Sequence, residues 1–515
     1  MKKNFILFYV CVLLSNESIS QCLNNVYKGF GGSGYDMGGS ILTDNVGNAY
    51  ITGTFVDSIQ LGSYTLTADT VGIYLMKLSE QGNVLWAKLL ITEDHNNGYK
   101  VVLKISPSGK LLVAGTSKNF QSDFDSLVNP FTGGDVFLAQ YNITTGSLEK
   151  FLSTGNHGYS SVADFDFDDS GNIYMAGGFV GPITFGSFNM VCTGTGNTWI
   201  AKFNSDFVAQ WAMRATNNPT SGNGSSKIVY DGGAYVYVAG GFGISCNFGS
   251  GFVLNSPSYN NGYLAKIDTS GNISWVKSSR PDGTYFHLLL VDTSTIFVVR
   301  ESPAELVRYN QFGDTTWSRV IGTNAYTLFN EVKFYGGRIF AGGNRYGTLT
   351  LSDSTYNIPE WFIYIARFDL NGSVEAIRSV GICSATLSFD IDDDQNIHIA
   401  GSYCFPDTIE QTMLPAFGNN DILYSKLCHA AVGVNEQIVS EKTTPFPIPF
   451  SENLHLDKTE DGGDIILFDI EGREVLKQAS VSGQTSISTI SLAPGFYVLH
   501  YSNKSLNKTW KVVKN

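Results

Sequence analysis

Short segments in which apolar and polar residues alternate recur along most of the chain, and glycine-rich turns separate them. In the stretch DFDFDD, Asp164, Asp166 and Asp168 share one side of an extended segment, while Phe165 and Phe167 share the other. No long stretch carries apolar residues at helical spacing. The 55 glycines and the aromatic content of 13% also suit many short strands and turns. The pattern therefore predicts an all-β protein.

A turn segment repeats along the chain at a near-constant period. It reads DNVGNAYITGTF from Asp44, SPSGKLLVAGTS from Ser106, DDSGNIYMAGGF from Asp168, YDGGAYVYVAGGF from Tyr230 and DDDQNIHIAGSY from Asp392. The turn glycines Gly47, Gly109, Gly171 and Gly233 lie 62 residues apart. Self-similarity at a fixed spacing indicates an array of equivalent units.

Each unit continues with an apolar strand, such as GIYLMKL from Gly72, and with a last strand that usually carries a tryptophan, such as Trp86. Four strands joined by turns bury little on their own, so several such sheets must pack face to face around an axis. We count seven units, with a degenerate fifth around 291–299. Residues 24–30 resemble the last strand that the seventh unit lacks, and we expect them to complete that unit and close the ring.

Aspartates occupy the same turn position in three units, at Asp44, Asp168 and Asp392. A short side-chain oxygen there accepts hydrogen bonds from turn N–H groups, so we interpret these residues as turn-stabilising. Carboxylates at alternate positions near a glycine also resemble calcium loops. The calcium candidates are Asp164, Asp166, Asp168, Asp392 and Asp394. Neither stretch has the full calcium-loop spacing with a distal Glu, so we expect no cofactor and keep calcium as the alternative.

The signals D-x-x-G-N-x-Y-x-x-G, then F-G, an apolar strand and G-x-x-x-W recur in this order over residues 24–428. This order resembles the SBBP-type repeat of secreted bacterial proteins. The resemblance implies a seven-bladed β-propeller of four-stranded blades in which the N-terminal strand closes the last blade. We assign this propeller to residues 21–430.

The first residues, MKKNFILFYVCVLLSNESISQC, predict a signal peptide over residues 1–20. Lys2 and Lys3 precede a ten-residue apolar run, which is too short for a membrane span of roughly 20 residues. Small residues near the end of this segment place the cleavage between Ser20 and Gln21. The mature chain is then exported and has no transmembrane segment.

An exported chain permits disulfides, and six cysteines follow the predicted cleavage site. We expect one pair across the ring closure and one across a hairpin, because paired strands bring Cα atoms within roughly 7 Å. These pairs are Cys22 with Cys428 and Cys383 with Cys404. Free buried thiols are the alternative for each pair. The pairing of Cys192 and Cys246, in adjacent units, stays open.

The pattern changes after Cys428. Residues 431–446 are polar and contain proline, which indicates a linker, and the short strands of 447–515 predict a small antiparallel β-sandwich. PIPFSENLHL, LFDIEGREVLK, ISLAPGFYVLHY and TWKVVKN resemble, in order, the type A C-terminal sorting domain of the type IX secretion system. Its motif residues here are Pro447, Pro449, Gly472, Gly495 and Tyr497. The family usually opens with Pro-Asn-Pro, which Pro-Ile-Pro replaces here. The alternative is a generic carbohydrate-binding or adhesion sandwich.

The net charge of −13 argues against nucleic acid and anionic membranes as partners. The sorting-domain resemblance implies export through the periplasm by the type IX machinery, with the protein secreted or held at the cell surface. We predict a non-catalytic binding or adhesion scaffold for a protein or glycan ligand. The alternative is a glycan-active hydrolase or lyase, which requires convergent ionisable groups at one face of the propeller.

Overall fold

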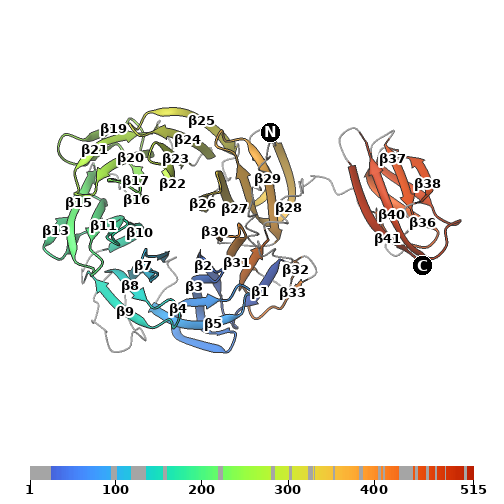
Figure 1. Ribbon diagram of the computed structural model, residues 1–515, viewed down its shortest axis with the longest axis horizontal. Helices are drawn as coiled ribbons and strands as arrows, with labels where there is room; N and C mark the ends of the chain where they lie inside the picture. Colours follow the sequence, from blue (N-terminus) through green and yellow to red (C-terminus); the bar gives the residue numbers. More distant parts are fainter. Residues whose placement is uncertain are drawn as a thin grey trace, which may run out of the picture. The chain divides into compact units, whose positions relative to one another are not determined.

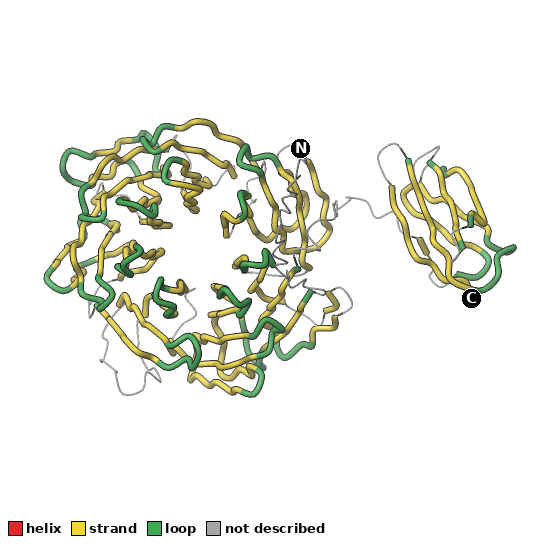
Figure 2. The backbone as a smooth tube through the Cα atoms, in the orientation of Figure 1, coloured by secondary structure: helices red, strands yellow, loops and turns green. Residues whose placement is uncertain are grey.

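The computed structural model describes residues 25–93, 101–117, 135–154, 159–217, 224–279, 285–300, 304–322, 329, 331–351, 354–381, 387–403, 407–409, 412–428, 445–446, 450–459, 463–469, 473–481, 483–503 and 507–515. All regular elements in these residues are β-strands, which confirms the all-β prediction (Figures 1 and 2). The chain divides into two compact units, residues 1–437 and 438–515.

Unit 1 is built from consecutive antiparallel sheets, of which the described residues form seven. Six of them have four strands, and sheet 3 is extended to six by β18 (Ser245–Asn247) and β19 (Val253–Asn255), because β18 pairs with its fourth strand. Sheet 1 contains β2 (Met37–Thr43), β3 (Ala49–Leu61), β4 (Tyr64–Leu78) and β5 (Val84–Glu93); sheet 2 contains β6 (Val102–Ile105), β7 (Leu111–Ser117), β8 (Asp135–Tyr141) and β9 (Leu148–Ser153); sheet 3 contains β10 (Tyr159–Phe167), β11 (Ile173–Val180), β14 (Asn197–Phe203) and β15 (Ala209–Asn217); sheet 4 contains β16 (Gly224–Tyr230), β17 (Tyr235–Phe242), β20 (Asn261–Asp268) and β21 (Ile273–Ser278). Sheet 5 contains β22 (Tyr285–Asp292), β23 (Thr295–Arg300), β24 (Ala304–Asn310) and β25 (Thr315–Gly322); sheet 6 contains β26 (Glu331–Tyr335), β27 (Arg338–Leu351), β28 (Ser354–Phe368) and β29 (Val374–Gly381); sheet 7 contains β30 (Leu387–Ile391), β31 (Ile397–Tyr403), β34 (Asp421–Leu427) and β1 (Val26–Phe30).

The sheets of unit 1 follow one another around a common centre, with the first strand of each sheet innermost (Figure 1). Each first strand contacts the first strand of the next sheet, in the order β2, β6, β10, β16, β22, β26 and β30, and β30 contacts β2. Apolar clusters fill the space between neighbouring sheets, such as Val102 and Leu112 of sheet 2 with Phe165 and Trp199 of sheet 3. Each sheet therefore hides the apolar face of its neighbour, and the arrangement is β-propeller-like.

The first and last strands that the structure describes in unit 1 lie in one sheet. β1 pairs antiparallel with β34, so that Val26 faces Lys426. The Asn25 side chain accepts a hydrogen bond from the Cys428 backbone N–H, 403 residues away, at 3.0 Å. Cys428 also forms a disulfide. The predicted partner Cys22 lies outside the described residues, so this pairing stays a prediction.

Other predictions on cysteines and processing also lie partly outside the described residues. Cys383, Cys404 and the cleavage site between Ser20 and Gln21 belong to segments that the structure does not describe. Cys192 and Cys246 are described, and both are in the thiol form. Neither forms a disulfide with the other.

Tryptophans join neighbouring sheets at the rim of the ring. The indole of the fourth strand packs on a glycine in the turn between the third and fourth strands of the next sheet, and a Cβ added to that glycine would lie 2.8–3.3 Å from the ring. These pairs are Trp86 with Gly146, Trp211 with Gly271, Trp275 with Gly313 and Trp317 with Gly372. All four glycines have positive φ, which other residues rarely adopt. Glycine is therefore required there by both conformation and space.

Unit 2 contains two sheets. One consists of β35 (Pro445–Phe446), β36 (Asn453–Thr459) and β39 (Gly483–Ser488); the other consists of β37 (Asp464–Phe468), β38 (Glu474–Ala479), β40 (Gly495–Ser502) and β41 (Asn507–Lys514). Residues from both sheets, including Leu454, Leu467 and Leu499, are fully buried in one core. β35 pairs with β36, so the first strand of this unit begins at Pro445, inside the segment that the sequence assigns to the linker.

Of the predicted motif residues of unit 2, Gly495 begins β40 and Tyr497 is buried, with its hydroxyl donating to the Ala493 carbonyl at 2.7 Å. Pro447, Pro449 and Gly472 lie outside the described residues. In the part of the chain that the structure describes, no helix has the length and apolar character needed to cross a membrane.

Candidate functional site

Asp168 holds the turn between the first two strands of sheet 3. Its carboxylate accepts hydrogen bonds from the backbone N–H groups of Ser170 and Asn172, at 3.0 and 2.9 Å. It also accepts from the Asn172 side chain and from the Tyr174 hydroxyl, at 2.8 and 3.0 Å. Burial opposes ionisation, but the bonds from Asn172 and Tyr174 outweigh it and hold the pKa of Asp168 below its usual value. This aspartate therefore fixes the turn.

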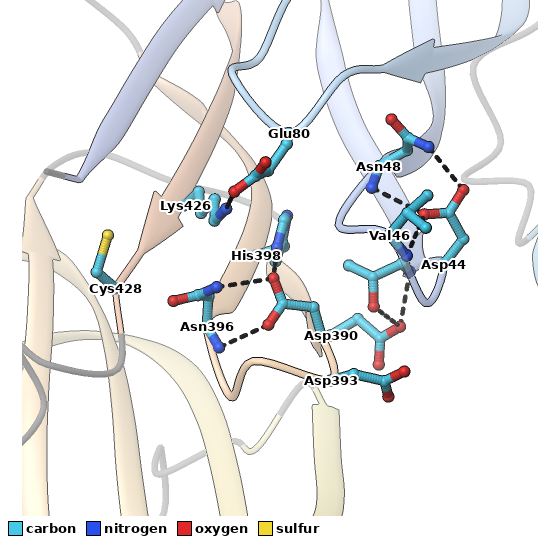
Figure 3. A network of polar contacts seen from close by, with 12 residues as sticks. Asp44, Val46, Asn48, Glu80, Asp390, Asp393, Asn396, His398, Lys426 and Cys428 are labelled. Carbon is cyan, nitrogen blue, oxygen red and sulfur yellow. Dashed lines mark hydrogen bonds and ion pairs between the residues drawn. The ribbon is translucent and has the colours of Figure 1, made fainter. Parts of the chain in front are cut away.

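The same arrangement recurs in sheets 1 and 7 (Figure 3). Asp44 accepts from the backbone and side chain of Asn48, both at 2.9 Å. Asp392 accepts from the backbone and side chain of Asn396, at 2.8 and 2.9 Å. A histidine, His398, replaces the tyrosine of the motif and lies 2.9 Å from the Asp392 carboxylate. The motif D-x-x-G-N-x-Y is thus one hydrogen-bonded unit.

The repeat glycines lie in the turn between the first and second strands of each of the first four sheets. Gly47, Gly109 and Gly171 have φ values of 76°, 72° and 77°. In sheet 4 the positive φ, 75°, is found at Gly232, the residue before Gly233. In this turn the Asp231 carboxylate accepts hydrogen bonds from the backbone N–H groups of Gly233 and Tyr235, at 2.9 and 3.0 Å.

Charged side chains gather on the innermost strands. Lys104 of β6 lies 3.1 Å from the Asp166 carboxylate and 3.9 Å from that of Asp164, both on β10. Lys227 of β16 lies 3.9 Å from Asp164 and 3.5 Å from Glu331 of β26. Four first strands are therefore joined by ion pairs.

The chain of contacts continues to the first sheet. Lys333 of β26 lies 3.5 Å from Asp390 of β30. The other Asp390 oxygen accepts from the backbone N–H and hydroxyl of Thr43 of β2, at 2.8 and 3.1 Å (Figure 3). We call the charged members the inner charge cluster: Lys104, Asp164, Asp166, Lys227, Glu331, Lys333 and Asp390.

The carboxylates of this cluster keep its lysines charged. Burial disfavours the Lys104 ammonium, but Asp164 and Asp166 outweigh it and raise the pKa of Lys104. Burial likewise disfavours the Lys333 ammonium, and Asp390 and Glu331 reverse the effect and raise the pKa of Lys333. The Asp164 side chain is only 4% exposed. Partly buried charges of opposite sign stay paired, because an unpaired charge there would be costly.

The calcium candidates predicted from the sequence lie either in the inner charge cluster or in the hydrogen-bonded turns. Asp164 and Asp166 face lysines, while Asp168 and Asp392 accept protein hydrogen bonds. Among the described residues, no group of three or more His, Cys, Asp or Glu side chains could hold a metal ion. Asp394 lies in the same turn as Asp392 and joins no such group among those residues.

The segments between the second and third strands differ from sheet to sheet. They form the hairpins β12 (Pro182–Phe185) with β13 (Phe188–Val191), β18 (Ser245–Asn247) with β19 (Val253–Asn255), and β32 (Asp407–Ile409) with β33 (Thr412–Leu414). Because they occupy the same place in equivalent sheets, they lie at the same face of the ring. Each exposes an apolar side chain, with Val191 59%, Val253 48% and Met413 73% exposed. We call them the variable hairpins.

Residues 444–515 match the model of a protein family described as "Secretion system C-terminal sorting domain". The match starts one residue before β35 and covers unit 2 from there to residue 515. The second unit is thus a type IX sorting domain, as its sequence motifs predict, and it indicates export to the cell surface or secretion.

Several solved structures resemble the chain. A protein of unknown function from Bacteroides caccae shares 12% identity over 57% of this chain and 93% of its own, with a TM-score of 0.29. The phage phi92 endosialidase shares 8% identity over 95% of this chain and 87% of its own, with a TM-score of 0.36. PorZ, a surface component of the type IX secretion system of Porphyromonas gingivalis, shares 8% identity over 95% of this chain and 100% of its own, with a TM-score of 0.18. These values are too low to support an inference about this chain. No curated protein matches it.

Proposed function

We propose that the protein is an exported, non-catalytic scaffold in which a closed, seven-bladed propeller binds a protein or glycan at the cell surface. The sorting domain supports the proposed localisation, because it indicates export to the cell surface or secretion. The pairing of β1 with β34 and the closed circle of contacts between first strands support the closed ring.

The variable hairpins are the observation that carries the binding role. Three equivalent segments at one face of the ring differ in sequence and expose apolar side chains. Exposed apolar groups on loops that a rigid scaffold positions are typical of interaction sites. The ring supplies that rigidity, since its sheets share buried cores.

The inner charge cluster supports a scaffold role over catalysis. Asp164 and Asp166 face Lys104, Glu331 faces Lys227, and Asp390 faces Lys333. A carboxylate that acts as a general acid needs a raised pKa, which a neighbouring ammonium opposes. The cluster is still the place where several ionisable groups converge, so a glycan-active hydrolase or lyase is the alternative to be tested there.

The test uses the mature chain, residues 21–515, on an array of glycans and bacterial surface proteins, with product analysis of every glycan that binds. We expect binding without turnover, and we expect Met413→Ser to weaken binding to a protein ligand. Glycan cleavage that Glu331→Gln abolishes, and that the control Glu474→Gln on exposed β38 retains, would establish the alternative. A chain that binds nothing on the array would refute the binding role.

A further inference from the structure

Five positions in each of several sheets form a common contact set between neighbours. In sheet 3 this set comprises Asp168, Asn172, Tyr174, Lys202 and Trp211. The Lys202 ammonium lies over the Tyr174 ring, at 4.9 Å from its centre. Lys202 and the Trp211 indole both donate to the Thr269 carbonyl of sheet 4, at 3.1 Å each. The set thus joins sheet 3 to sheet 4.

Sheets 1 and 4 build the same junctions. Sheet 1 supplies Asp44, Asn48, Tyr50, Lys77 and Trp86, and sheet 4 supplies Asp231, Tyr235, Tyr237, Lys266 and Trp275. Lys77 donates to the Ile143 carbonyl at 3.1 Å, as Lys202 does to Thr269. In each case the tryptophan packs on a turn glycine of the next sheet.

Sheet 2 differs at all five positions. It carries Ser106, Lys110, Leu112, Gln140 and Lys150 in their place. The strand register fixes the equivalence, because Gln140 pairs with Lys150 as Lys202 pairs with Trp211. The sheet has therefore lost a tyrosine and a tryptophan from its junction with sheet 3.

The facing turn of sheet 3 has changed as well. Phe207 lies in the turn between the third and fourth strands, at the position where sheets 4, 5 and 6 carry Gly271, Gly313 and Gly372. Its N–H donates to the Asn204 carbonyl at 2.9 Å, as the Gly271 N–H does to the Asp268 carbonyl at 3.0 Å. Phe207 has φ 65°, a conformation that a bulky side chain adopts only under strain. Strained residues cluster at functional sites, so this one directs attention to the junction.

A pocket of about 460 Å³ lies at this junction, in the range of small-ligand sites. Its apolar lining includes Leu112, Ile173 and Phe207, all of which are buried. Its polar lining includes Ser106, Gln140 and Asp169. The substituted positions of sheet 2 and the strained phenylalanine thus line one cavity.

The two lysines that line this pocket are already paired with carboxylates. Lys110 lies 2.8 Å from Glu149. Lys150 lies 2.6 Å from Asp206 and donates to the Ser205 carbonyl at 3.0 Å. A multiply charged anion such as phosphate would find no free cation in these lysines. Hydroxyl, amide and carboxylate groups over an apolar floor instead suit a neutral ligand that donates and accepts hydrogen bonds and has one apolar side.

We propose that the pocket between sheets 2 and 3 binds a neutral saccharide unit of one or two rings. Sugar hydroxyls would meet Ser106, Gln140 and Asp169, and the C–H face of the ring would lie on Leu112 and Phe207. The inference rests on the proposed binding role. It adds to that role a second binding site, separate from the variable hairpins, and a class of ligand for this site.

The test builds into the junction between sheets 2 and 3 the tryptophan–glycine contact that sheets 1, 3 and 4 each make with the next sheet. The double variant Lys150→Trp with Phe207→Gly places an indole on a glycine and fills the pocket. Binding of glucose, galactose, mannose, N-acetylglucosamine and their disaccharides to mature chain is measured by calorimetry and ligand-observed NMR, with inorganic phosphate as the contrast. We expect at least one saccharide to bind, and the double variant to lose affinity at least tenfold with an unchanged melting temperature. Lys88→Trp, at an exposed site on β5, is the matched control and should change affinity less than twofold.

Gln140→Met removes an amide and keeps the side-chain length, and it decides the question if the double variant does not fold. We expect a loss of affinity of several-fold from it. Failure of every saccharide to bind the wild type, tighter binding of phosphate, or affinity unchanged in the double variant and in Gln140→Met would overturn the pocket inference. If the double variant keeps the array binding of the wild type while no saccharide binds, the scaffold role stands and the pocket inference falls.

Discussion

The junction between sheets 3 and 4 and the junction between sheets 2 and 3 solve the same packing problem in opposite ways. At the first, Trp211 covers Gly271 and the Lys202 ammonium closes on a carbonyl of the next sheet. At the second, Lys150 replaces the tryptophan, Phe207 replaces the glycine, and a pocket is left. The comparison teaches that the ring tolerates junctions without the tryptophan–glycine contact, because among the described residues only four of the junctions between its sheets have it.

The largest expected difference between junctions is in stability. Trp86 is 5% exposed and packs on Gly146, so Trp86→Ala leaves a cavity and should lower the free energy of unfolding by about 3–5 kcal/mol. The Lys150 side chain is 38% exposed, so Lys150→Ala should cost less than about 1 kcal/mol. Urea unfolding of both variants measures the contrast, and equal costs would remove the distinction between a filled and an open junction.

A third kind of junction, where the ends of unit 1 meet, should depend on pH. Asp36 donates its N–H to the Asn420 carbonyl and accepts from Gly32 N–H at 2.6 Å. Burial raises the pKa of Asp36 to about 6 from 3.8. The folded state therefore holds a proton that the unfolded chain releases, so this group's contribution to stability is present below about pH 4 and is lost as pH rises to about 6.

Asp36→Asn mimics the protonated acid. It should flatten the pH dependence between pH 4 and 6 and raise the unfolding free energy at pH 7 by up to about 3 kcal/mol. Denaturant unfolding across this range measures the effect. Asp69→Asn, at an exposed site on β4, serves as control and should leave the slope unchanged. A slope that survives in Asp36→Asn would show that another group causes it.

The side chains that hold the turns at the two compared junctions should also differ in how much they stabilise the protein. Asp168→Ala removes the acceptor for two backbone N–H groups, the Asn172 amide and the Tyr174 hydroxyl, and should cost about 2 kcal/mol. Ser106 in sheet 2 accepts one backbone bond, from Lys110, so Ser106→Ala should cost less than about 1 kcal/mol. Melting temperatures of the two variants measure this difference. A larger decrease for Ser106→Ala than for Asp168→Ala would contradict the prediction.

The smallest expected effect concerns metal ions. Because the carboxylates of Asp168 and Asp392 accept protein hydrogen bonds, a calcium chelator should move the melting temperature of the mature chain by less than about 1 °C. A drop of several degrees that calcium restores and magnesium does not would revive a calcium role for these turns.

Much of this architecture could be predicted from the sequence, because local patterns encode it. Alternation in DFDFDD places Asp164 and Asp166 on one side of β10, and the repeated turn motif marks where strands begin. The sorting domain is readable for the same reason, since its signals are short and ordered. In sheet 4 the repeat places two adjacent glycines in the turn, and the structure shows that Gly232 takes the left-handed conformation.

The sites were less predictable, because they depend on which sheets become neighbours. Nothing local marks Lys227 and Glu331 as partners, since they belong to sheets 4 and 6. The pocket leaves a signal only when the repeats are aligned by strand register. Lys150 then lies at the position of the tryptophan in the fourth strand, and Phe207 lies at the position of the glycine in the turn between the third and fourth strands. A departure from the repeat at two facing positions is the clue that finds it.

The pairing of β1 with β34 also sets the order of events during folding. β1 can pair with β34 only after nearly all of unit 1 has been synthesised, since the contact between Asn25 and Cys428 spans 403 residues. Contacts between such distant segments are slow to form, because the chain must close a very large loop first. Until then β1 has no neighbouring strand and presents open edges to any passing strand. The chain is therefore exposed to aggregation from the emergence of β1 until β34 reaches it, and a chaperone that covers β1 should protect the chain during that period.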